Sequence, residues 1–193
     1  IASIAVRNSR LYEKACMEAR TDELTGLLNR KYFYELLNQQ YEKKPNKELA
    51  LIIINIDDFK LYNQLYGMKE GDAALQNAAK IISATVGERG YVARYSGKEF
   101  AAALPDFDVL AARNIAESIR MQILNMNKRA TDYALKVLTV SCGICTIPYS
   151  ASNIKQLVEN ADMAVFSVKR KGKNGVMVYD IGSHIDGNAK GGE

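Results

Sequence analysis

The stretch that decides the fold is YVARYSGKEFAAAL, residues 91–104. It contains two short apolar runs, 91–95 and 100–104, on either side of a polar turn that includes a glycine. This pattern is typical of a β-hairpin, and its tip is Ser96-Gly97-Lys98-Glu99. Because paired strands support the tip rigidly, its charged side chains form a suitable platform for binding or catalysis.

The segments around the hairpin predict helices and strands in alternation. Continuous apolar runs predict buried strands at 49–54 and 138–147, and a short last strand is expected at 176–179. Apolar residues at helical spacing predict helices at about 30–41, 59–66, 70–86, 109–123 and 153–169, with Asn29 and Asp108 as N-caps. Asp57 and Asp58 are expected to cap the helix that begins at Phe59. The order predicts an α+β domain, with helices packed on one mainly antiparallel sheet.

The two ends of the chain are expected to lie outside this domain. Residues 1–20 show apolar residues near heptad spacing and predict a coiled-coil linker helix, or alternatively a helix packed on the domain's own surface. The chain opens on Ile1, which suggests a piece of a longer protein. Residues 181–193 are Gly-rich and polar and are expected to form a flexible tail, so the domain is placed at 21–180.

Composition narrows the function classes. Twenty-six Lys and Arg against 22 Asp and Glu leave a formal charge of +4, and no basic cluster interleaved with aromatic residues indicates a nucleic-acid surface. No apolar run approaches transmembrane length and no signal peptide is visible, so a cytoplasmic location is expected. Cys142 and Cys145 lie three apart in a predicted strand and should point to opposite faces of the sheet. We therefore expect small buried core residues there, not a metal site or disulfide.

The polar residues at the end of the 49–54 strand and at the hairpin tip are expected to lie side by side. Two-metal phosphoryl-transfer sites place carboxylates at two such points. Four motifs surround this place in a regular order: DELTGLLNR at 22–30, NIDDFK at 55–60, RYSGKEF at 94–100 and KRKGKN at 169–174. Their order and spacing resemble the GGDEF family, the diguanylate cyclase domain, across residues 21–180.

The resemblance carries expectations for the whole domain. It implies a palm-like, ferredoxin-like fold related to nucleotidyl cyclases. The family condenses two GTP into cyclic di-GMP across a dimer of domains and uses magnesium. The helix at 1–20 resembles the linker that often joins such domains to a GAF-like or similar sensor, so a homodimer of the full-length protein and an upstream sensor domain are implied.

At the metal positions this sequence departs from the family. Asn55 stands where the family has its first metal carboxylate, next to Ile56, whose carbonyl is the family's backbone ligand. Lys98 stands at the second carboxylate position, and the motif as a whole reads Ser-Gly-Lys-Glu-Phe. An amide oxygen brings no negative charge to a dication, and a lysine cannot ligate one. Magnesium binding is therefore predicted to be weak or absent.

The nucleotide positions are better preserved. The resemblance implies guanine contacts from Asn63 and Asp72, while the rest of the site comprises the signature residues Ser96, Gly97 and Glu99 and the phosphate contacts Lys169 and Lys173. Gln64 and Met68 differ from the family's usual aspartate and histidine. The family's product-inhibition motif, Arg-x-x-Asp, falls on Gly87 and Gly90, so feedback binding of cyclic di-GMP there is not expected.

Three functions are left open by these observations. The first is a degenerate, catalytically inactive regulatory domain that binds GTP or a related nucleotide. In such a domain, the Lys98 ammonium either takes the place of a magnesium ion or is a solvated turn lysine. The second is a slow cyclase that uses Asn55, Glu99 and the Ile56 carbonyl. The third is a dimerisation or interaction module for which nucleotide is irrelevant.

Overall fold

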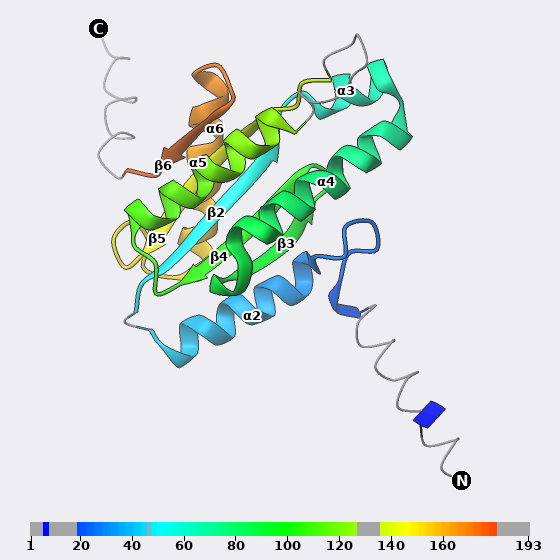
Figure 1. Cartoon of the computed structure of the whole chain (residues 1–193). Coiled ribbons are helices and arrows are strands. Elements are labelled where there is room, and N and C mark those ends of the chain that lie inside the picture. The colour runs from blue at the N-terminus through cyan, green and yellow to red at the C-terminus, as the bar shows by residue number, and fades with distance from the viewer. Residues whose placement is uncertain (1–5, 8–18, 46, 127–135, 181–193) are drawn as a thin grey trace, which may run out of the picture.

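A mixed six-stranded sheet organises the molecule (Figure 1). The computed structural model describes residues 6–7, 19–45, 47–126 and 136–180. The strands lie in the order β1-β3-β4-β2-β5-β6. Their bounds are β1 Leu28–Asn29, β2 Leu49–Ile56, β3 Tyr91–Ser96, β4 Glu99–Pro105, β5 Val140–Ile147 and β6 Gly175–Val178.

The centre and the edges of the sheet differ in strand direction. β2 pairs antiparallel with both β4 and β5, and β3 pairs antiparallel with β4. The two outer pairs, β1 with β3 and β5 with β6, are parallel. The prediction of an α+β domain with a mainly antiparallel sheet is confirmed, although β1 and the two parallel outer pairs were not predicted.

Helices cover both faces of the sheet. Their bounds are α2 Arg30–Lys43, α3 Phe59–Tyr66, α4 Met68–Val86, α5 Val109–Asn125 and α6 Ile154–Arg170, with a short 3₁₀ helix at Gly87–Arg89. The predicted N-caps at Asn29 and Asp108 are confirmed, because each side chain accepts a backbone N–H from the first turn of its helix. No helix among these described segments is long and apolar enough to cross a membrane.

The alternation of side chains along β2 divides the core into two. Ile52, Ile54 and Ile56 join the buried residues of α3, α4 and α5, whereas Leu51 and Ile53 join those of α2 and α6. All five side chains are fully buried, as expected for a central strand covered on both faces. The sheet thus lies between two layers of helices, and α4 and α5 lie side by side over one face (Figure 1).

The cysteine prediction is confirmed for the two cysteines that the structure describes. Cys142 and Cys145 are free and buried, and they belong to the cores on opposite faces of the sheet. Burial raises the pKa of both thiols, so they are protonated core residues at neutral pH.

The predictions for the chain ends fall mostly outside the described residues. Of the expected linker helix at 1–20, only residues 6–7 and 19–20 are described, and the expected tail at 181–193 is not described.

Candidate functional site

The C-terminal end of β2 meets the hairpin tip, as the sequence predicts. Asn55 is the cross-strand neighbour of Glu99 on β4 and of Ser141 on β5. The backbone N–H of Ile56 donates to the carbonyl of Lys98 at 3.0 Å. The sheet thus brings both predicted metal positions to one place.

A chain of hydrogen bonds fills this place. The ammonium of Lys169, near the C-terminal end of α6, donates to Oδ1 of Asn55 at 2.7 Å. Nδ2 of Asn55 donates to Oε1 of Glu99 at 2.5 Å, and the hydroxyl of Ser96 donates to Oε2 of the same carboxylate at 2.6 Å. Partial burial, followed by the charge of Lys98, lowers the pKa of the Lys169 ammonium. It is Lys169, and not Lys98, that contacts Asn55.

These residues do not fit a divalent cation. The oxygen of Asn55 already accepts from an ammonium, and both oxygens of Glu99 accept hydrogen bonds from neighbouring side chains. In this hydrogen-bond network Glu99 supplies the carboxylate, and the two lysines near it, Lys169 and Lys98, repel a metal ion. Over the described ranges, no group of three or more His, Cys, Asp or Glu side chains is arranged to hold a metal.

Asp57 anchors the loop that follows α6, and it does not cap α3 as predicted. Its carboxylate is 5% exposed and accepts the hydroxyls of Thr139 at 2.8 Å and Ser141 at 2.7 Å. It also accepts the backbone N–H of Asn174 at 3.1 Å. Charge-assisted hydrogen bonds of this kind are about twice as strong as neutral ones, so Asp57 holds β5 and the loop against the end of β2.

The capping prediction also fails for Asp58. This residue occupies the N-cap position of α3, but its φ is 49°, in the left-handed region, and its side chain makes no capping hydrogen bond. Its two carboxylate oxygens, Oδ1 and Oδ2, instead accept hydrogen bonds from the Lys173 ammonium at 2.7 and 2.8 Å. Lys173, a predicted phosphate contact, is therefore held by a protein carboxylate here.

A cavity of about 620 Å³ opens beside this network and gathers four of the predicted residues. They are Asn63, Asp72, Gly97 and Lys98, and the rest of the lining is Phe59, Lys60, Gln64, Met68, Leu75 and Arg94. The Lys98 ammonium has no hydrogen-bond or ion-pair partner among the described residues, unlike Lys169 and Lys173. It is thus the lysine of the three that is available to an anion in the cavity.

Asn63 is built into the wall of this cavity in an unusual way. Its Oδ1 is buried and has no hydrogen-bond partner within the described part of the chain. A Cβ at position 71 would lie 1.8 Å from that oxygen, so only glycine fits at Gly71. Buried polar atoms rarely go unpaired, so this oxygen is an exception, and it packs directly against Gly71.

Arg94 is a site residue whose partners the sequence did not reveal. Its guanidinium pairs with Asp22 at 3.2 Å and donates to the carbonyl of Gly97 at 2.9 Å, so it ties the hairpin tip to the loop before β1. Although partial burial acts to raise the pKa of Asp22, hydrogen bonds from Thr25 and the charge of Arg94 lower it overall. Both residues lie in the motifs identified from the sequence, but they are 72 positions apart, so the sequence could not show that they are in contact.

The sheet, with polar residues at the ends of its central strands and a cavity beside the hairpin tip, defines a domain of the nucleotidyl-cyclase palm class. The family model described as "Diguanylate cyclase, GGDEF domain" matches residues 19–175, and the chain belongs to this family. The resemblance drawn from the motifs is thereby confirmed, as is the palm-like fold.

Curated relatives and solved structures agree with this assignment. The chain is 34% identical over 183 residues to Diguanylate cyclase A of Treponema denticola, covering 91% of this chain and 47% of that protein. It is 34% identical over 180 residues to the protein YtrP of Bacillus subtilis, covering 93% of this chain and 30% of that protein. The chain thus spans less than half the length of these relatives.

A solved structure extends the comparison to the backbone. The coiled coil and GGDEF domain of DgcB from Caulobacter crescentus, solved in complex with c-di-GMP, superposes with a TM-score of 0.83 at 28% identity. The match covers 92% of this chain and 94% of that one.

Proposed function

We propose that this chain is a GGDEF domain that has lost cyclase activity and serves cyclic di-GMP signalling in the bacterial cytoplasm as a guanine-nucleotide-binding regulatory domain. The observation that carries the proposal is the row of hydrogen bonds from Lys169 through Asn55 to Glu99, which puts an ammonium against the residue at the family's metal-ligand position. In the full-length protein, we expect the domain to act as a homodimer below an upstream GAF-like sensor domain.

Loss of the metal explains why turnover should be negligible. Metal ions supply several kcal/mol of charge stabilisation in phosphoryl transfer, and about 1.4 kcal/mol corresponds to a tenfold change in rate. Neither Asn55 nor Lys98 can restore that stabilisation, because one is neutral and the other repels the cation.

Binding of the nucleotide does not depend on the same groups. Asn63 and Asp72 border the cavity and can hydrogen-bond a purine edge. Lys98, which lines the same cavity, offers a positive charge to a phosphate. These features favour a nucleotide-binding domain over the slow cyclase and over a module for which nucleotide is irrelevant.

The test combines a product assay with a nucleotide titration. Purified protein incubated with GTP and magnesium should make no cyclic di-GMP, and robust product formation would contradict the loss of activity. Calorimetry should show weak binding of GTP and weaker binding of ATP, because the base contacts distinguish the two. Asp72→Ala should abolish GTP binding while Glu88→Gln, at an exposed position on the 3₁₀ helix, leaves it unchanged. If GTP and ATP do not bind at all, the interaction-module function is favoured instead.

A further inference from the structure

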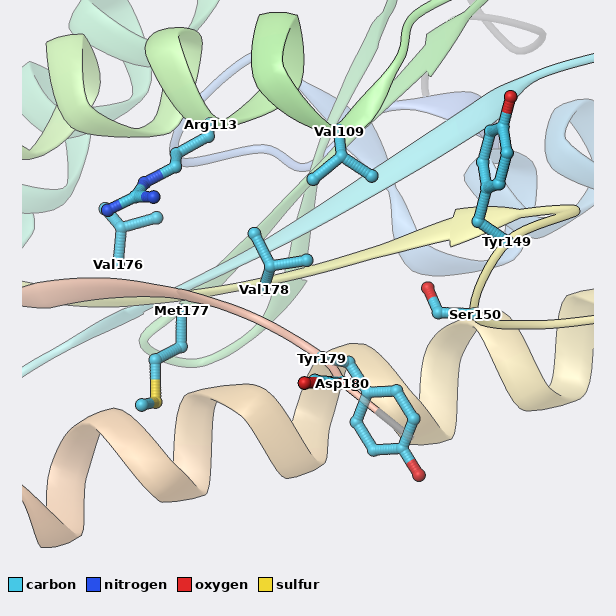
Figure 2. Close-up of a pocket in the computed structure, with 9 residues that line it drawn as sticks. All are labelled: Val109, Arg113, Tyr149, Ser150, Val176, Met177, Val178, Tyr179 and Asp180. Atoms are coloured by element: carbon cyan, nitrogen blue, oxygen red, sulfur yellow. The ribbon is translucent and has the colours of Figure 1, made fainter. Parts of the chain in front are cut away.

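A second cavity lies at the β6 edge of the sheet, away from the residues discussed above. Its volume is about 620 Å³, and it is lined by β6, the first turns of α5 and the turn after β5 (Figure 2). Val176 and Val178 of β6 point toward α5, from which Val109 and Arg113 extend to meet them (Figure 2). We call this cavity the β6 groove; its full lining is Val109, Arg113, Tyr149, Ser150 and residues 176–180.

The floor of the groove is the edge of the sheet. β6 is the last strand in the sheet order, and β5 is its neighbour on one side. The N–H of Tyr179 donates to Ile144 of β5, and bonding direction alternates along a strand, so Val176 and Val178 direct their N–H and C=O groups away from β5. These groups have no backbone partner within the described part of the chain.

This edge lacks the usual protection against strand pairing. Proteins commonly guard an exposed edge with proline, lysine or a bulge. The strand reads GVMV and contains none of these, and its register with β5 is regular. Tyr149, which lines the groove, is 64% exposed, and its hydroxyl donates to Oε1 of Glu48 at 2.9 Å. The edge is thus unguarded, and an exposed aromatic side chain lines the groove beside it.

α5 adds a charge at a defined distance. Val109 and Arg113 are four residues apart on α5, which is about 6 Å along the helix axis. Alternate side chains of an extended peptide are about 6.6 Å apart, which is close to this spacing. The guanidinium of Arg113 has no carboxylate partner among the described residues, and Figure 2 shows it above Val176. Asp180 also lines the groove.

We propose that the β6 groove binds an extended segment of a partner protein that carries an apolar and an acidic side chain two residues apart. The segment adds a strand to β6 through the backbone groups of Val176 and Val178. Its apolar side chain packs on Val109 and Val178, and its carboxylate pairs with Arg113. This surface is separate from the nucleotide site and does not rest on the proposed function.

The probe is a fluorescein-labelled eight-residue peptide in which valine and glutamate stand two apart between threonines. Both sequence orders are used, because a strand can add parallel or antiparallel. Anisotropy with the full chain should show saturable binding of one order. Replacing glutamate by lysine should weaken that binding by about tenfold or more, because the lysine would face Arg113. Arg113→Glu should reverse the preference, whereas Lys80→Glu, on the exposed surface of α4, should change nothing.

Two further variants separate the alternatives. Val178→Pro removes one outward donor without touching the β5 pair and should abolish binding, with circular dichroism reporting that the fold is kept. Absence of saturable binding for both orders, or binding that is indifferent to charge at position 113, would overturn the proposal. It would also be overturned if binding appeared only in a chain ending at Asp180, or if sedimentation showed a dimer that Arg113→Glu dissociates. The occupant would then be the chain's own end or a second copy.

Discussion

The ammonium of Lys169 lies 2.7 Å from the side-chain oxygen of Asn55, although the two residues are 114 positions apart in the sequence. This contact joins the C-terminal part of α6 to the end of β2 and continues through Asn55 to Glu99. In a family whose chemistry uses magnesium, a protein cation thus contacts Asn55, the residue at the metal-ligand position. The predictions below follow from this contact and from the loops around it.

Restoring both carboxylates should restore activity only when they are present together. Asn55→Asp alone would give Lys169 a strong ion-pair partner, and Lys98→Asp alone would face the neutral Asn55, so neither single variant should make cyclic di-GMP. The double variant, with Ser96→Gly added to let the backbone reach the phosphate, should make measurable product. The effect is expected to be strongly non-additive. If the folded triple variant is also inactive, the charge at these two positions is not what limits the domain, and Gln64, Met68 or dimer geometry is more important.

Asp57→Asn should destabilise the fold. The buried carboxylate accepts two hydroxyls and a backbone N–H, and an amide at this position would turn a donor toward one of them. The expected loss is about 2 kcal/mol in the free energy of unfolding, measured by urea denaturation. Asp58→Asn is the matched control, because its pair with Lys173 is exposed and screened by solvent and should contribute little. Equal losses for the two variants would contradict the assignment of Asp57 as the anchor.

The product-inhibition motif should not be recoverable by substitution at Gly90. A Cβ on Gly90 would lie 2.2 Å from the backbone oxygen of Ala103, so any side chain forces the start of β3 away from β4. Gly90→Asp, even with Gly87→Arg, is expected to lower the melting temperature and to create no tight binding of cyclic di-GMP. Gly97→Asp is the control, because a Cβ on Gly97, at the tip of the β3–β4 hairpin, meets no atom within 4 Å. An unchanged melting temperature for Gly90→Asp would show that the backbone can yield.

The lowered pKa of Lys169 should appear as a pH dependence of stability. Burial and the nearby Lys98 favour the neutral amine in the folded state, so the unfolded chain binds more protons as pH rises from the lowered pKa to the ordinary value. In that window, the free energy of unfolding of the wild type should increase relative to that of Lys169→Met. Lys171→Met, at an exposed position, is the control, and the difference between its free energy of unfolding and that of the wild type should not change with pH in this window. A wild-type curve parallel to that of Lys169→Met would mean that the amine is not perturbed.

The sequence was sufficient for the main elements because their signals are local. The hairpin, the buried β2 run and the caps at Asn29 and Asp108 each depend on a few neighbouring residues. β1 was missed because two residues are too few to show a period. Asp57 and Asp58 were misread as caps because their true partners, on β5 and in the loop after α6, lie more than 80 positions away. Local sequence favours capping by Asp57 and Asp58, but in the folded domain their side chains bind these distant partners instead.

The candidate site could likewise be predicted from the sequence only in part. Motif order located the cavity residues Asn63, Asp72, Gly97 and Lys98, which the structure brings together. It could not show which lysine meets Asn55, because that depends on how α6 docks on the sheet.

The most direct measurement of the central claim is the affinity for GTP in excess magnesium and in excess EDTA, determined by calorimetry on the same preparation. If lysine ammonium groups have replaced the metal, the two dissociation constants should agree within about threefold, a difference of about 0.7 kcal/mol. The Asn55→Asp, Lys98→Asp variant is the internal comparison, and its affinity should rise when magnesium is present. Tight binding by the wild type that disappears in EDTA would show that the site still holds a metal, and would contradict the account.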